Sequence, residues 1–158
     1  MKLLLSLLTA AIVLGCTSIK QESPYSVITY EAGPCYGFCP IYKITINSDR
    51  TAILEAERFN FSQTRDSQQG EGTYRTVIKN EQYRQLLHLI EVLQPLKLNE
   101  FYGNRNVSDL PTSYLTLRYQ NGSQKKVEDY GKQGTPELQE LYAFFDELKT
   151  NQNWTKNQ

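Results

Sequence analysis

The sequence contains few of the residues from which most metal and catalytic sites are built. It has three cysteines, and His88 is its single histidine. No G-x-S-x-G segment, the turn that carries the nucleophile of many hydrolases, occurs along the chain. A zinc site built on two of the cysteines would need two further ligands. Only one further cysteine and one histidine are present in the chain. We therefore expect no catalytic residues, no metal and no cofactor.

An excess of charge of one sign is also missing. The chain has 17 Lys and Arg residues against 17 Asp and Glu residues. Proteins that bind nucleic acid usually carry a basic surplus, so we expect no nucleic-acid partner. The uncharged apolar run from Leu3 to Leu14 has 12 residues, whereas a membrane-spanning helix needs about 20. The sequence therefore does not favour a membrane-spanning helix at this run.

The N-terminal run is instead typical of a secretion signal. Lys2 precedes it, and it ends in Val13-Leu14-Gly15-Cys16, which resembles the lipobox of bacterial lipoproteins. In such proteins the cysteine receives fatty acyl chains and becomes the new N-terminus, and several chains anchor a protein stably to a membrane. We predict a lipoprotein signal peptide over 1–15 and a lipidated tether over 16–25. A buried apolar helix ending at a Gly-Cys pair fits this terminal position less well.

A lipobox places the mature protein in the bacterial cell envelope. Thr17, rather than Asp, follows the cysteine, which is typical of the outer membrane in enteric-type families. The part from 26 to 150 is long enough for one globular domain with a core of its own, and 151–158 reads as a polar tail. Once Cys16 carries lipid, Cys35 and Cys39 remain as an even pair in an oxidising compartment.

The two remaining cysteines lie four positions apart in a segment rich in glycine and proline. In an extended strand Cys35 and Cys39 would be about 13 Å apart, whereas a disulfide requires Cα atoms within about 7 Å. The chain must therefore turn between them if they pair, and Gly37 stands where a positive φ is least costly. Pro34 and Pro40 restrict φ just outside each cysteine. The segment predicts a small covalent ring.

Three chemistries are open to this cysteine pair: a structural disulfide, a redox pair and a metal site. Thioredoxin-type redox centres have two residues between their cysteines and stand at a helix start, which lowers the pKa of one thiol. Here three residues intervene and a strand follows, so we favour a structural disulfide. So short a ring adds only about 2 kcal/mol of stability and serves mainly to fix local shape. A ring at 35–39 would present Tyr36 and Phe38 at its rim.

The rest of the chain predicts an α+β fold with an antiparallel sheet and two helices on one face. Asn121-Gly122 is a strong hairpin signal, and Thr135 followed by Pro136 is a helix N-cap followed by proline at the first helical position. Asn80 is expected to cap the other helix, which Pro95 stops. Strands are expected over 27–30, 41–46, 51–59, 73–78, 113–119 and 124–130, a polar excursion over 60–72, and a short helical turn over 97–102. The order strand–strand–helix occurs twice, over 41–93 and 113–149, which suggests two ββα halves, although few residues match between them.

A family resemblance rests on the cysteine segment. Cys35-Tyr36-Gly37-Phe38-Cys39-Pro40-Ile41-Tyr42-Lys43 resembles the C-[FY]-G-x-C-P-x-Y signature of bacterial lipoprotein domains, which we identify as the domain-of-unknown-function 6438 family. The resemblance continues through Asp109-Leu110-Pro111-Thr112, the Asn-Gly hairpin and the last helix, so it covers about 26–149. It implies an envelope location and one fold, and it brings no assigned activity or catalytic residue.

The sequence thus favours a noncatalytic lipoprotein that binds an envelope protein or glycan. The candidate contact surface is the ring with Tyr36 and Phe38, extended by Tyr42 and Asp109. Asp109 would otherwise accept hydrogen bonds within its own turn. The alternative function is an envelope thiol-disulfide oxidoreductase that uses the two ring cysteines.

Two further polar positions have simpler interpretations. His88 falls off the apolar stripe of its helix, so it is expected to be solvated. Asp129 stands at a strand end, where it terminates the strand or lies near the ring.

Overall fold

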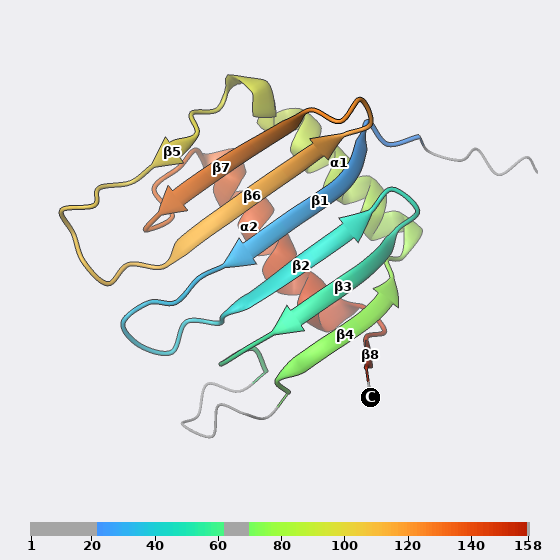
Figure 1. Ribbon diagram of the computed structural model, residues 1–158, viewed down its shortest axis with the longest axis horizontal. Helices are drawn as coiled ribbons and strands as arrows, with labels where there is room; N and C mark the ends of the chain where they lie inside the picture. Colours follow the sequence, from blue (N-terminus) through green and yellow to red (C-terminus); the bar gives the residue numbers. More distant parts are fainter. Residues whose placement is uncertain (1–21, 62–69, 158) are drawn as a thin grey trace, which may run out of the picture.

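An eight-stranded sheet forms one layer of the computed structural model, and two helices cover one of its faces (Figure 1). The structure describes residues 22–61 and 70–157. The expected signal peptide, Cys16 and most of the tether lie outside these residues, as does the middle of the excursion at 60–72. The predicted α+β class, with a largely antiparallel sheet and two helices, is confirmed.

The strand order in the sheet is β5-β7-β6-β1-β2-β3-β4-β8. The first strand of the chain therefore lies in the middle, paired antiparallel with β2 and with β6. Only the pair of β5 and β7 is parallel among the described strands. The bounds are β1 (Tyr25–Ala32), β2 (Tyr42–Asn47), β3 (Thr51–Ala56), β4 (Gly72–Val77), α1 (Asn80–Leu93), the 3₁₀ helix η1 (Pro95–Lys97), β5 (Phe101–Tyr102), β6 (Thr112–Tyr119), β7 (Gln124–Tyr130), α2 (Pro136–Asn151) and β8 (Thr155–Lys156).

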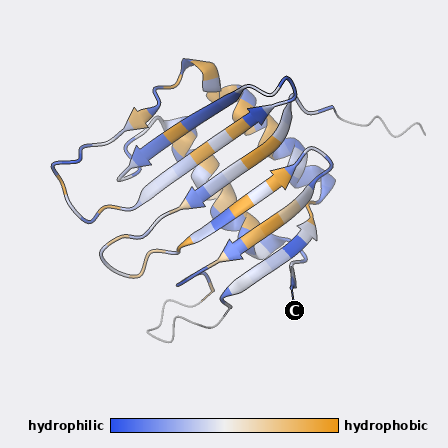
Figure 2. Cartoon of the chain, viewed as in Figure 1, coloured by the Kyte–Doolittle hydropathy of each residue, from blue (hydrophilic) through white to orange (hydrophobic). Residues whose placement is uncertain are grey.

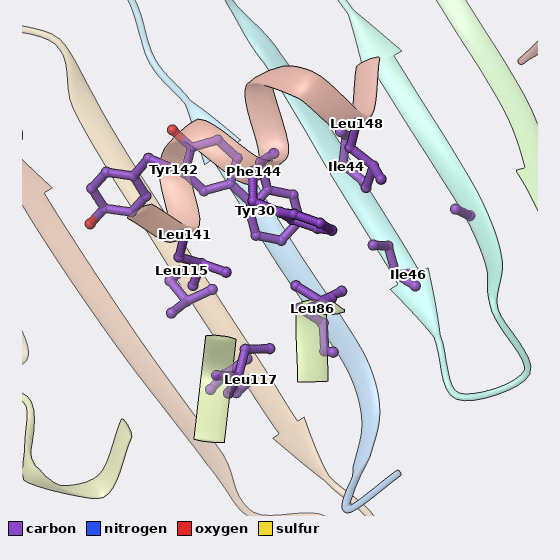
Figure 3. Close-up of a cluster of buried hydrophobic side chains, with 14 of the residues drawn as sticks. Tyr30, Ile44, Ile46, Leu86, Leu115, Leu117, Leu141, Tyr142, Phe144 and Leu148 are labelled. Atoms are coloured by element: carbon purple, nitrogen blue, oxygen red, sulfur yellow. The ribbon is translucent and has the colours of Figure 1, made fainter. Parts of the chain in front are cut away.

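Alternation along the strands decides which face is buried. In β2, Tyr42, Ile44 and Ile46 are buried while the residues between them are partly exposed, and hydrophobic and hydrophilic colours alternate along the central strands in Figure 2. Both helices turn their apolar stripes toward this buried face. In Figure 3, Leu86 of α1 and Leu141 of α2 point toward the sheet. One continuous core results.

Aromatic side chains form the centre of this core. Tyr30 of β1 stacks on Phe145, with ring centroids 4.7 Å apart, and on Tyr142, with centroids 5.4 Å apart. The Tyr30 hydroxyl lies 3.2 Å from the Ser113 hydroxyl. The hydroxyl of this fully buried side chain therefore has a hydrogen-bond partner. Burial raises the pKa of Tyr30. The core is therefore fixed by oriented rings and not by aliphatic packing alone.

The C-terminal segment differs from the expected polar tail. Helix α2 continues to Asn151, Gln152 is buried, and the Trp154 indole donates a hydrogen bond to the Leu148 carbonyl at 3.1 Å. Strand β8 then pairs with β4. Residues 152–157 are therefore packed along the domain, because the edge of β4 offers unpaired backbone groups that this segment satisfies.

The start of α1 also differs from the prediction. Asn80 is the first residue of the helix, and Lys79 occupies the N-cap position without a side-chain cap. The Lys79 backbone N–H instead donates to Oε1 of Gln152 at 3.0 Å. A distant segment thus supplies the acceptor for the backbone N–H of the N-cap residue itself. Thr135 does cap α2 as predicted, since its hydroxyl accepts from the Leu138 N–H at 3.3 Å.

The element order does not divide into two matching ββα halves. Strands β1 to β4 precede α1, and β5 to β7 lie between α1 and α2. The segment at 97–102 is not a helical turn: η1 ends at Lys97, and Phe101–Tyr102 pairs with β7. Leu98 is buried, whereas Phe101 is exposed.

The two ends of the sheet differ in character (Figure 1). At one end, here called the turn end, the tight β2–β3 and β6–β7 turns lie beside the start of β1, as the hydrogen bond from the Gln120 N–H to the Pro24 carbonyl at 2.9 Å shows. At the other, the loop end, lie the long connection from β1 to β2, which holds both ring cysteines, and the segments 103–111 and 131–135. The fold therefore separates the start of the described chain from the ring.

Candidate functional site

The ring forms as the sequence predicts. Cys35 and Cys39 are joined by a disulfide, and their Cα atoms are 5.7 Å apart. Gly37 at its middle has φ of +141°, a backbone conformation that residues other than glycine rarely adopt. Residues 35–39 are thus a closed loop whose turn depends on one glycine.

Two aromatic side chains stand on the rim of the ring. Tyr36 is 89% exposed, the highest value of any large hydrophobic side chain among the described residues, and Phe38 is 52% exposed. Phe38 meets the edge of Phe59 with ring centroids 5.2 Å apart, and Phe61 beyond it is exposed as well. An aromatic surface therefore extends from the ring to the segment that follows β3.

The segment 103–111 braces one side of the ring. The Tyr36 N–H donates to the Asp109 carbonyl at 3.0 Å, and the Gly33 N–H donates to the Thr112 carbonyl at 2.7 Å. Asp109 has φ of +68°, and its carboxylate accepts from the Ser108 hydroxyl at 2.9 Å, not from the backbone N–H groups expected in its turn. Asp109 is thus placed beside the ring, with its carboxylate exposed to solvent.

The Tyr130 hydroxyl holds this segment in turn. It donates to the Val107 carbonyl at 2.6 Å and accepts from the Leu110 N–H at 3.3 Å. Gly103 lies so close to Tyr130 that a Cβ there would come within 2.1 Å of the Tyr130 carbonyl oxygen. Tyr130, at the end of β7, therefore holds the segment 103–111 in place, and this segment in turn supports the ring.

The residues after β3 brace the other side. The Ile41 N–H donates to the Arg58 carbonyl at 2.9 Å, and the Glu57 N–H returns a bond to the Ile41 carbonyl at 2.9 Å. The side-chain amide of Asn60 donates to the same carbonyl at 2.8 Å. With both flanks hydrogen-bonded and the middle covalently closed, the backbone of the rim has little conformational freedom left to lose on binding.

Tyr42 is not part of this surface. Its side chain is 1% exposed and its hydroxyl donates to Oδ1 of Asp146 at 2.8 Å, while the Lys149 ammonium lies 4.0 Å from its ring centroid. Burial raises the pKa of Tyr42 and lowers the pKa of Lys149. The expectation that Tyr42 contacts a partner was wrong because Tyr42 shares its strand face with Ile44, and that face lies under the helices.

A hollow of about 280 Å³ lies at the base of the ring, where β1 and β2 separate. Pro34 and Ile41 supply apolar walls, and Glu31, Glu55 and Glu57 bring carboxylates to it. The Lys43 ammonium pairs with Glu55 at 2.6 Å, and this hydrogen bond raises the pKa of Lys43. The ring therefore borders a polar depression that offers hydrogen-bond acceptors as well as apolar contact.

Comparison with known proteins gives a family. A model described as a domain of unknown function, DUF6438, matches residues 26–149, which include the ring, α1, β2 to β7, and all but the end residues of β1 and α2. The chain belongs to the DUF6438 family. The family's description names no activity. No curated protein matches the chain.

Two other candidate residues of this DUF6438 domain have structural positions away from the rim. Asp129 is fully buried, and its carboxylate accepts from the N–H groups of Gln133 and Gly134 and from the Tyr142 hydroxyl. It fixes the turn that leads into α2. His88 is exposed on α1 at the turn end, as expected for a solvated helix residue.

The DUF6438 domain shows no constellation that would point to metal chemistry in the described residues. No group of three or more His, Cys, Asp or Glu side chains within 22–61 and 70–157 lies close enough to hold an ion. No helix in those ranges is both long and apolar enough to cross a membrane. Of the predicted contact residues, Tyr36 lies against Asp109 through a backbone hydrogen bond, and Phe38 packs on Phe59. The sequence analysis missed Phe59, whose only signal was its position at the end of an apolar strand.

Proposed function

We propose that this protein is a noncatalytic, lipid-anchored module of the bacterial envelope that binds an envelope protein or glycan through its disulfide-closed ring. One observation carries the proposal: Tyr36 and Phe38 are exposed on a loop that is closed covalently and braced on both flanks. Large aromatic side chains are favourable to bury, so exposing two of them on a rigid support gives up stability that a partner could recover.

The rigidity supports binding over a purely structural role. Aromatic residues are enriched at the centres of protein interfaces, and a side chain ordered before binding loses less entropy in the complex. The hollow beside the ring, with Glu31 and Glu57, would add polar contacts at the rim of such an interface.

The direction of the chain fits an anchored module. Cys16, the proposed lipidation site, precedes the turn end, and the eight residues of β1 separate that end from the ring. At about 3.3 Å per residue, β1 spans about 26 Å. A membrane anchor at Cys16 would leave the ring facing away from the lipid. The residue after Cys16, Thr17, favours the outer membrane as the site of this anchor.

The redox alternative has weaker support. The ring is followed by β2 and not by a helix, so no helix N-terminus stands behind either sulfur to stabilise a thiolate. A measured reduction potential of the Cys35–Cys39 pair above about −300 mV would favour the oxidoreductase.

Replacement of both rim aromatics tests the proposed function. We expect Tyr36→Ala with Phe38→Ala to abolish co-purification of the partner from envelope extracts after crosslinking, while the melting temperature stays nearly unchanged. Val77→Ala, which removes an apolar side chain of similar exposure to Phe38 on β4, is the matched control. Retention of the partner by the double variant, or unfolding of that variant, would show that the rim is not the binding surface.

A further inference from the structure

The described chain starts at a fixed point on the turn end. The Tyr25 N–H donates to the Ser23 hydroxyl at 3.1 Å, and the side-chain amide of Gln120 donates to the Ser23 carbonyl at 3.3 Å. Together with the bond from Gln120 to Pro24, these contacts tie the residues before β1 to the β6–β7 turn. The position of Ser23 and Pro24 beside this turn is therefore fixed.

Helix α1 lies directly beside this point (Figure 1). Glu22, Pro24 and Tyr25 share a hollow of about 510 Å³ with residues of α1, namely Arg84, Leu87, His88 and Glu91. The outer side of α1 is thus the helical surface beside Glu22, the first described residue of the chain.

This outer surface ends in two exposed apolar side chains. Arg84, His88 and Val92 follow one another at intervals of four residues, so they share one side of α1. Val92 is 49% exposed, and Leu96, in η1 just beyond, is 78% exposed. After Tyr36, Leu96 is the most exposed large hydrophobic side chain in the described part of the chain.

The length of the tether limits how far this surface can lie from a membrane. If Cys16 carries lipid, as the proposed function holds, six residue steps separate it from Glu22 and span about 21 Å at most. A short tether makes any contact between this end and the bilayer an intramolecular event at high effective concentration. Two apolar side chains can then suffice for a contact that a free domain would not make.

We propose that the outer side of α1 and η1 rests on the phospholipid interface, with Val92 and Leu96 in contact with lipid. The inference rests on lipidation of Cys16 and goes beyond it, because it fixes the orientation of the domain. The exposed ionic side chains of α1 and η1 balance, with Arg84 and Lys97 against Glu81 and Glu91. The contact is therefore apolar, and it forms equally on neutral and anionic membranes.

Site-directed labelling of the full-length protein, purified from bacterial membranes and mixed with vesicles, tests this orientation. Single cysteines at Val92, Leu96 and Val107 receive a fluorescent label, with the native disulfide kept oxidised. Val107 is the matched control, because it is 44% exposed like Val92 but lies at the loop end. We expect nitroxide lipids to quench labels at 92 and 96 about twofold or more above the label at 107, in phosphatidylcholine and phosphatidylglycerol vesicles alike.

Flotation of the same samples separates the two proposals. Protein that floats with the vesicles but shows equal quenching at 92, 96 and 107 would overturn the orientation and leave the anchor intact. Protein that fails to float would overturn lipidation and the orientation with it. Labels at 92 and 96 that are shielded from lipid and aqueous quenchers alike would show that a protein covers this surface, which also contradicts the proposal.

Discussion

At the scale of single residues, tyrosine serves two different purposes in this domain. Tyr36 faces solvent on the ring, whereas Tyr30, Tyr42 and Tyr142 lie in the core with their hydroxyls paired to polar side chains. Burial raises the pKa of each of these three, so their neutral forms are the stable ones in the folded protein. Only position within the strand or loop, and not residue type, separates the exposed tyrosine of the proposed binding surface from the buried ones.

Replacing Tyr42 tests that separation. Tyr42→Phe keeps the ring under Lys149 but removes the hydrogen bond to Asp146, so the free energy of unfolding should fall by about 1–2 kcal/mol. Urea unfolding followed by circular dichroism measures the loss. Partner binding should be unchanged, because the side chain is buried beneath the sheet. A folded Tyr42→Phe protein that no longer binds the partner would return Tyr42 to the contact surface.

At the scale of elements, the C-terminal segment protects an edge. Strand β8 pairs with only Tyr74 and Arg75 of β4, and Gln152 supplies the acceptor for the Lys79 N–H at the start of α1. An uncovered edge strand can pair with a second copy of the chain. Residues 152–157 thus contribute to both the edge of the sheet and the start of α1.

Truncation after Asn151 should expose this edge. We expect the shortened protein to lose about 1–3 kcal/mol of stability, because the Lys79 N–H becomes unpaired and Trp154 packing is lost. It should also form dimers or larger species, which light scattering after size-exclusion chromatography would detect. Lys156→Ala keeps the backbone pairing and should keep the oligomeric state of the unaltered protein. A truncated chain with the stability and oligomeric state of the full one would contradict an edge-protecting role.

Local signals predicted most elements because their causes are local. The alternation in β2, the Asn121-Gly122 turn and the Thr135-Pro136 helix start each depend on neighbours in sequence. Strand β8 and the cap of α1 depend on groups more than 70 residues apart, such as Lys79 and Gln152, and no local pattern encodes them. The ring was predictable from the cysteine spacing, but the fate of Tyr42 required knowledge of which strand face the helices cover.

At the scale of the whole molecule, the two ends of the domain carry different structural features. Tight turns, the start of β1 and α1 lie at the turn end, whereas the ring and its bracing segments lie at the loop end, with β1 running between them (Figure 1). This arrangement suits a protein fixed to a membrane at one end that presents a rigid aromatic surface at the other.

The most direct measurement places a photo-crosslinking amino acid at Tyr36 in the full-length protein and irradiates intact cells. A second variant carries the same group at Val77, an exposed position on β4. If the ring binds an envelope partner, Tyr36 should give one dominant crosslinked species that Val77 does not. Crosslinks at Val77 with none at Tyr36, in protein shown to be folded and oxidised, would contradict binding through the ring.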